Sequence, residues 1–286
     1  MILMIFACSP RMLYPKLDWL IPWYVDDYIS LDRSQSSLVS SRLARQLDWH
    51  CRTQLPQYAK FLQNIRRDVG NNSQPLTVER LEVYNARLTR YWYALLKQIG
   101  PDVIDILVSA SNDQIAELFE NLERKNREME IDLTERSSQK ITRNRQKRMQ
   151  KRLRYWFSDL TAPQKQAVVE WSMHLDSIAT DWIAHRRKVQ DAAKRQLMHR
   201  DNSVEFEAEF LELLTNTRIL RTENYQQKIE INTERTLALL VDVSNTLTPA
   251  QKTHFSNRLQ SLVVDLDQMS CNPALKVDRI EINLDS

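Results

Sequence analysis

The sequence predicts an all-α protein, an elongated multi-helix bundle with one or more long helices. Only two glycines occur in 286 residues, whereas average usage of about 7% would give roughly twenty. Glycine supplies the φ > 0 conformation of tight turns, so its scarcity argues against β-sandwiches, β-barrels and glycine-loop nucleotide folds. Hydrophobic residues at 42% and charged residues at 27% are ordinary for a folded protein. The formal net charge of +3 gives the whole chain no polyelectrolyte character.

Residues 1–7 are all apolar and run directly into Cys8. Ile5, three positions before the cysteine, and the small Ala7 just before it match the box at which bacterial lipoprotein signals are cut before the cysteine is lipidated. A complete signal has a charged region and about 7–15 apolar residues, so we interpret residues 1–7 as a signal remnant, with a start codon assigned too late. The alternative is the apolar first turn of a buried helix. No other stretch approaches the ~20 apolar residues of a transmembrane helix.

Residues 8–30 form a segment rich in proline and aromatic residues, which precedes the helical body. Its prolines predict irregular backbone or short helices. We expect Trp19 and Trp23 to pack back onto the helical body. The alternative is that Trp19, Trp23 and Tyr28 contact a membrane or a partner, because Trp and Tyr favour the headgroup region of a bilayer.

Helix starts are the clearest local signals in residues 31–270, the predicted helical domain. A Leu-[Asp/Thr]-x-x-Gln pattern places an acceptor side chain at the N-cap and a glutamine at N3, which form the two reciprocal bonds of a capping box. The pattern occurs three times, with cap pairs Asp32 and Gln35, Thr161 and Gln164, and Thr248 and Gln251. Ser111 and Gln114 form a looser version. Pro163 and Pro249 lie in the first turn, where a missing N–H does no harm.

The spacing of apolar residues predicts the extents of the helices. Apolar stripes indicate helices over 76–99, 163–197, 204–246 (as one long or kinked helix) and 249–269, the first of them stopped by Gly100-Pro101. Residues 113–157 contain neither Gly nor Pro and are expected to form one helix of about 68 Å. Pro56 should break or kink the first helix near Leu55. Residues 271–286 are expected to be a loose C-terminal tail.

Residues 140–154 contain eight Lys or Arg and no acid. The candidate contacts to an anionic surface are Lys140, Arg143, Arg145, Lys147, Arg148, Lys151 and Arg152. Our first interpretation is a solvated helix face, offset within the bundle by residues 117–135, which carry seven acids against three bases. Attraction to an anionic membrane surface is the second interpretation. Binding of nucleic acid is the third, and the lack of interleaved aromatic residues disfavours it.

No recognisable catalytic or metal-binding motif occurs in the chain. The five histidines show no HxxxH or HExxH spacing, and Gly70 and Gly100 alone cannot build a phosphate-binding loop. An enzymatic role is therefore disfavoured, and we predict no cofactor and no metal site. Cys51 and Cys271 lie 220 positions apart. We expect two free thiols, with a disulfide as the alternative if the protein works in an oxidising periplasm.

A longer pattern in the N-terminal part is typical of a known family. Residues 17–28 read LDWLIPWYVDDY, the first capping box follows, and then come Trp49-His50 and Leu55-Pro56-x-Tyr58. Together with Cys8, these residues resemble an uncharacterised, DUF6279-like family of proteobacterial lipoproteins, most densely over residues 8–62. The resemblance implies secretion, lipidation at Cys8 and an all-α fold, and it implies no activity.

Three functional hypotheses follow. The first is a lipoprotein of the periplasmic face of the outer membrane, anchored by a lipid on Cys8, with a binding or structural role; Ser9, rather than Asp, after the cysteine favours the outer membrane. The second is a chaperone for unfolded or envelope proteins, because the boxes at Leu160 and Leu247 resemble the LTxxQ motif of Spy-like periplasmic chaperones. The third is a cytoplasmic nucleic-acid-binding protein that uses residues 140–154.

Overall fold

The computed structural model describes residues 10–70, 75–134, 137–200 and 204–271, and all regular elements within them are helical. The predicted all-α class is therefore confirmed. In chain order the α-helices are α1 (Pro10–Leu13), α2 (Leu17–Asp26), α3 (Arg33–Trp49), α4 (Leu55–Gly70), α5 (Val78–Ser109), α6 (Asn112–Thr134), α7 (Ser138–Phe157), α8 (Ala162–His174), α9 (Ala179–Met198), α10 (Val204–Thr215), α11 (Glu223–Asn245) and α12 (Pro249–Met269). Two 3-10 turns, η2 (Tyr14–Lys16) and η4 (Thr217–Leu220), and a π-helical turn, η3 (His50–Gln54), join some of them. Short helices in the first segment match the sequence-based expectation.

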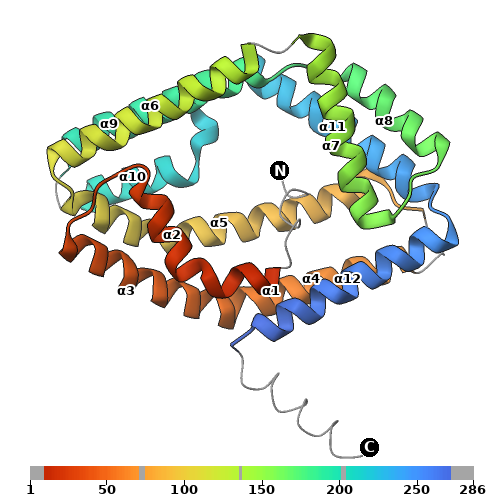
Figure 1. Ribbon diagram of the computed structural model, residues 1–286, viewed down its shortest axis with the longest axis horizontal. Helices are drawn as coiled ribbons and strands as arrows, with labels where there is room; N and C mark the ends of the chain where they lie inside the picture. Colours follow the sequence, from red (N-terminus) through yellow and green to blue (C-terminus); the bar gives the residue numbers. More distant parts are fainter. Residues whose placement is uncertain (1–9, 71–74, 135–136, 201–203, 272–286) are drawn as a thin grey trace, which may run out of the picture.

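The helices trace a closed, flattened ring (Figure 1). Along one long side, α12 packs on α4, and α5 returns beside α3. On the opposite side α6 packs on α9, and α7, α8 and α11 pack together at one end of the ring. Because α12 also contacts α1, helices from the two ends of the chain meet and close the ring.

Two separate hydrophobic cores hold the two ends of this ring. The first joins α5, α6, α9 and α10 through buried side chains such as Ile104, Ile115 and Phe210. The second joins α7, α8 and α11 through side chains such as Leu153 and Val168. Each such side chain contributes about 1.5–3 kcal/mol to stability by its removal from water. Burial of apolar side chains therefore stabilises both ends of the ring.

The predicted N-caps are confirmed, and they are joined in pairs that we call Gln clasps. In the first Gln clasp, the buried side-chain amides of Gln164 and Gln251 exchange two hydrogen bonds, at 3.1 and 2.9 Å. Each amide also accepts from its own N-cap backbone N–H, that of Thr161 or Thr248, at 3.0 Å. Each amide nitrogen donates as well to a backbone carbonyl just before the partner's cap, Thr246 at 3.2 Å and Asp159 at 2.7 Å. Both donor and both acceptor positions of each amide are thereby used.

The second Gln clasp repeats this arrangement with Gln35 and Gln114. Their amides exchange hydrogen bonds at 3.0 and 2.7 Å. The amide nitrogen of Gln35 donates to the Ser109 carbonyl at 3.1 Å, and that of Gln114 donates to the Ser30 carbonyl at 2.6 Å. The clasps therefore fasten the start of α3 to the start of α6, and the start of α8 to the start of α12.

The single helix expected over residues 113–157 is wrong. The chain forms α6 and α7 instead, and Ser137 caps α7 by accepting a hydrogen bond from the Lys140 N–H. The two helices serve different parts of the ring, since α6 packs on α9 whereas α7 packs on α8 and α12. Burial against separate partners outweighs the absence of a local breaker.

The stop expected at Gly100-Pro101 is also wrong, because α5 runs through it to Ser109. An internal proline costs roughly 3 kcal/mol, and packing on both sides of it offsets that cost. Gly100 is buried beneath Leu211 of α10, in direct contact with it. Asp102, only 6% exposed, forms ion pairs with Arg42 and Arg45 of α3.

Two further helices predicted as continuous are interrupted. Residues 204–246 form α10, η4 and α11, and Thr222 is the N-cap of α11: its hydroxyl accepts from the Tyr225 N–H at 3.2 Å. The apolar stripe over 163–197 is divided between α8 and α9. Arg235 of α11 donates to the His174 carbonyl and pairs with Asp176 at 3.2 Å, so the interruption is held by contacts distant in sequence.

Candidate functional site

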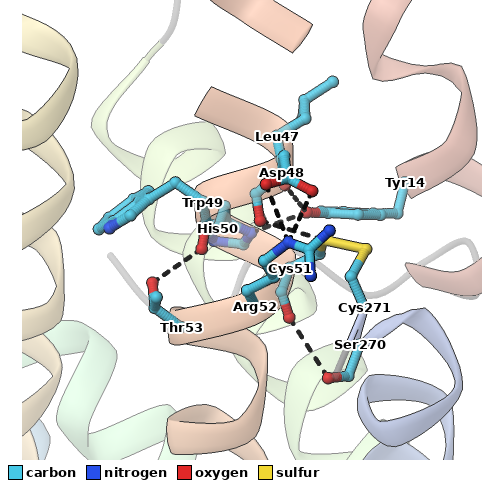
Figure 2. Close-up of a disulfide and its surroundings, with 10 residues drawn as sticks. All are labelled: Tyr14, Leu47, Asp48, Trp49, His50, Cys51, Arg52, Thr53, Ser270 and Cys271. Carbon is cyan, nitrogen blue, oxygen red and sulfur yellow. Dashed lines mark hydrogen bonds and ion pairs between the residues drawn. A yellow bond between two sulfur atoms is a disulfide. The ribbon is translucent and has the colours of Figure 1, made fainter. Parts of the chain in front are cut away.

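A disulfide between Cys51 and Cys271 joins the π-helical turn to the end of α12 (Figure 2). The sulfurs lie 2.10 Å apart and the Cα atoms 5.2 Å apart. The expectation of two free thiols is therefore wrong. Because the two cysteines are 220 positions apart, the sequence could not show whether they lie close together in the fold. The packing of α12 along α4 brings them together. The disulfide is a covalent closure of the ring.

The π-helical turn and Pro56 together leave the Cys51 carbonyl without a partner in its own helix. In a π-helix a carbonyl accepts from the N–H five residues later, which for Cys51 would be Pro56, a residue without an N–H. The Cys51 carbonyl accepts instead from the Cys271 N–H at 3.3 Å and from the Ser270 hydroxyl at 3.3 Å. The break or kink predicted near Leu55 takes the form of this π-helical turn, which lies between α3 and α4.

Tyr14 docks the N-terminal helices against the same turn. Its hydroxyl donates to the Leu47 carbonyl at 3.3 Å and lies 3.0 Å from Nδ1 of His50, on which its ring stacks. The edge of Tyr58 meets the His50 ring with centroids 5.6 Å apart. Burial and the neighbouring Tyr58 raise the pKa of Tyr14 to about 12, and burial lowers the pKa of His50. Both rings are therefore neutral near pH 7.

Acidification is expected to weaken this contact through His50. Burial holds its pKa in the folded protein below the unfolded value of about 6.5, so the unfolded chain binds the proton more readily. The His50 contribution to the free energy of unfolding is therefore present above about pH 6.5 and falls below it, by at most about 1.4 kcal/mol per pH unit. His185, whose pKa burial also lowers, acts in the same direction.

Urea denaturation at pH 7.5 and pH 5.0 measures this effect. The His50→Gln variant, which cannot titrate, should lose less stability between the two pH values than the parent protein, whatever its stability at pH 7.5. An identical loss in both proteins would contradict the assignment to His50.

The aromatic side chains of α2 lie at the surface rather than against the body. Trp19 is 55% exposed and Trp23 is 59% exposed, so the expectation that both pack back onto the body is wrong. They lie four positions apart and share one face of α2. Tyr24, at 57% exposed, shares a hydrogen bond of 3.0 Å with the hydroxyl of the half-buried Tyr28. Val25, on the inner face of α2, packs against the first hydrophobic core.

Most of the basic residues of α7 lie on its exposed face. We call the exposed residues Lys140, Arg143, Lys147, Lys151 and Arg154 the α7 basic stripe. Arg148, also exposed, lies beside this stripe, and Arg152 is half-buried. Arg145 turns inward and donates to the carbonyls of Ser172 and Leu175, at 3.0 and 3.1 Å, at the end of α8. Burial lowers the pKa of Arg145. Most of the basic residues of this stretch are therefore exposed, which fits both the solvated-face and the anionic-surface interpretations.

The acids of residues 117–135 do not offset this charge in the part of the chain that the structure describes. Glu123 and Glu130 bind Arg187 of α9 at 3.0 and 2.8 Å, and Glu128 pairs with Arg124 at 2.9 Å on its own helix. The sequence correctly showed where acids and bases concentrate, but α6 faces α9 and not α7.

The predicted lipidation box, Ile5, Ala7 and Cys8, lies outside the described residues. Among the helices that are described, none combines the length and the apolar character needed to span a bilayer.

Asp48 lies within 4.8 Å of both cysteine sulfurs, but in the disulfide these sulfurs are not thiolates, and the carboxylate pairs with Arg52 at 2.8 Å. This cluster is explained by the disulfide.

Comparison with known proteins adds one finding. No curated protein and no solved structure matches the chain, and the likeness of the Leu160 and Leu247 boxes to Spy-like chaperones gains no support. A family model described as a family of unknown function, DUF6279, matches residues 27–226. That match covers more than half of the chain, including both Gln-clasp residues of α3 and α6. The protein therefore belongs to the DUF6279 family.

Proposed function

We propose that this protein is a lipid-anchored lipoprotein of the bacterial envelope, on the periplasmic face of the outer membrane, with a helical body that has a binding or structural role. The Ile5-x-Ala7-Cys8 box motivates the proposal. The structural observation that best supports the proposal is the disulfide between Cys51 and Cys271. Disulfides persist in oxidising compartments such as the periplasm and are rare in the cytosol.

The exposed aromatic residues of α2 support the same proposal. The first helix begins at Pro10, two residues after Cys8. A lipid on Cys8 would hold this segment at the bilayer surface, where Trp and Tyr side chains are favoured. Trp19 and Trp23, whose side chains are largely exposed, would then face the membrane. A second contact of this kind strengthens a lipid anchor.

Labelling of the bacterium that carries the gene tests the proposal. The protein, expressed from its own genomic locus, should incorporate a radiolabelled fatty acid and sediment with the outer membrane. Cys8→Ala should lose the label and leave the membrane fraction, whereas Cys51→Ala, the matched control for a different cysteine, should keep the label. An unlabelled parent protein, or a Cys8→Ala variant that still carries the label, would overturn the proposal.

A further inference from the structure

We propose that the α7 basic stripe is a docking surface for anionic lipid headgroups, and that it holds one broad face of the ring against a membrane. The proposal deepens the proposed function by naming a second membrane contact, distant from the lipid anchor. Its test uses protein without a lipid, so that its outcome does not depend on whether Cys8 is acylated.

The geometry of the stripe fits a surface better than a point ligand. Lys140, Arg143, Lys147, Lys151 and Arg154 are separated by three or four positions, so they share one face of the helix. Over these residues the helix is about 21 Å long at 1.5 Å per residue. The whole of α7 contains no acid. The result is a row of exposed cations along one face of α7.

Internal pairing does not account for these cations. In the part of the chain covered by the structure, no carboxylate forms an ion pair with any residue of the stripe, whereas Arg42, Arg187 and Arg235 each bind an acid distant in sequence. Like charges three or four positions apart destabilise a helix. An anionic partner would relieve this repulsion.

A surface hollow at the start of α7 gives the stripe a place for an anionic group. The hollow has a volume of about 380 Å³, and the side chains of Lys140, Arg143 and Lys147 line it together with the polar Ser137 and Asn144. Ammonium and guanidinium groups with hydroxyl and amide donors are the groups that bind phosphate oxygens.

The position of α7 in the ring favours a membrane as the source of these phosphates. In Figure 1, which looks down the shortest axis, α7 passes in front of α11, and α2 lies on the same near side at a distance from it. The helix that carries Trp19 and Trp23 and the helix that carries the stripe therefore lie on one broad side of the molecule. Aromatic and basic contacts at separate points suit an extended anionic surface.

The aromatic residues of α7 argue against single-stranded nucleic acid as the partner. Such binding uses free rings on which bases stack. Trp156 is instead packed against Phe255 of α12, with ring centroids 6.0 Å apart, and the guanidinium of Arg258 covers the Tyr155 ring at 4.1 Å. Neither ring is available beside the stripe.

Vesicle binding of the full chain with Cys8→Ser tests the proposal. At 50 mM NaCl the protein should sediment with vesicles of equal parts phosphatidylglycerol and phosphatidylcholine, but not with phosphatidylcholine alone, and 300 mM NaCl should release it. Adding Lys140→Gln, Arg143→Gln, Lys147→Gln and Lys151→Gln should weaken the partitioning by about two orders of magnitude or more.

A matched control removes four exposed cations elsewhere: Arg33→Gln, Lys60→Gln, Arg90→Gln and Lys97→Gln in the same Cys8→Ser background. This control has the same net charge as the variant with four substitutions in the stripe, and it should retain most of the binding to the anionic vesicles. Circular dichroism verifies that both variants are folded. Absence of binding by the parent, equal loss in both variants, or tighter binding of duplex DNA than of the anionic vesicles in the same buffer would overturn the proposal.

Discussion

Replacing both Cys51 and Cys271 with alanine is expected to lower the free energy of unfolding by roughly 5 kcal/mol. The disulfide closes a loop of 220 residues, and in the chain-entropy model a loop of this length restricts the unfolded ensemble by about that amount. Because whole domains are stable by only about 5–15 kcal/mol, the loss is large. Urea denaturation followed by circular dichroism measures it.

Two comparisons separate the disulfide from its surroundings. Reduction of the parent protein should bring its urea midpoint close to that of the double alanine variant. Cys8→Ala, which removes the third cysteine, should leave the midpoint unchanged. If the double variant and the oxidised parent unfolded at the same urea concentration, the closure of the ring by Cys51 and Cys271 would contribute nothing to stability.

Gln164→Ala is expected to cost about 2–4 kcal/mol. The Gln164 amide is only 1% exposed, and its removal leaves the Gln251 amide, the Thr161 N–H and the Thr246 carbonyl short of partners. Each buried polar group left unpaired costs about 1–3 kcal/mol. Thermal or urea denaturation measures the effect.

The control for this substitution is Gln166→Ala on the same helix. Gln166 is exposed and bonds only to Glu170, at 3.0 Å, so its loss should change stability by no more than about 0.5 kcal/mol. The double variant Gln164→Ala with Gln251→Ala should cost clearly less than the sum of the two single variants, because each single change already breaks the shared bonds. Additive effects would show that the two glutamines act independently.

Local signals in the sequence predicted the helix starts. Most of the features that the sequence did not predict depend on long-range contacts. A capping box is complete within four residues, so Thr161 and Gln164 identify a helix start by themselves. The bond from Gln164 to Gln251 spans 87 positions, and nothing in either box specifies the partner. The Gly100-Pro101 dipeptide failed as a stop for a similar reason, because Leu211 and the partners of Asp102 are distant in sequence.

The same distinction between local signals and long-range contacts applies to the candidate sites. The acid-free run of cations over residues 140–154 led to the interpretation of a solvated helix face, but the sequence could not show that the acids of α6 face Arg187 instead. The exposure of Trp19 and Trp23 depends on which side of α2 meets the core. The pairing of Cys51 with Cys271 required the packing of α12 on α4. A signal for the special backbone at Cys51 was nevertheless present, since Pro56 follows it by five residues.

The Gln clasps have a consequence for how the protein opens locally. Helix ends are normally the first parts to fray, because their terminal groups lack partners within the helix. Here the start of α3 cannot open without breaking bonds at the start of α6, and α8 and α12 are linked in the same manner. Four helix ends are thereby converted into two cooperative units of local unfolding. The ring should accordingly be protected at its corners, where a chain of separate helices would be weakest.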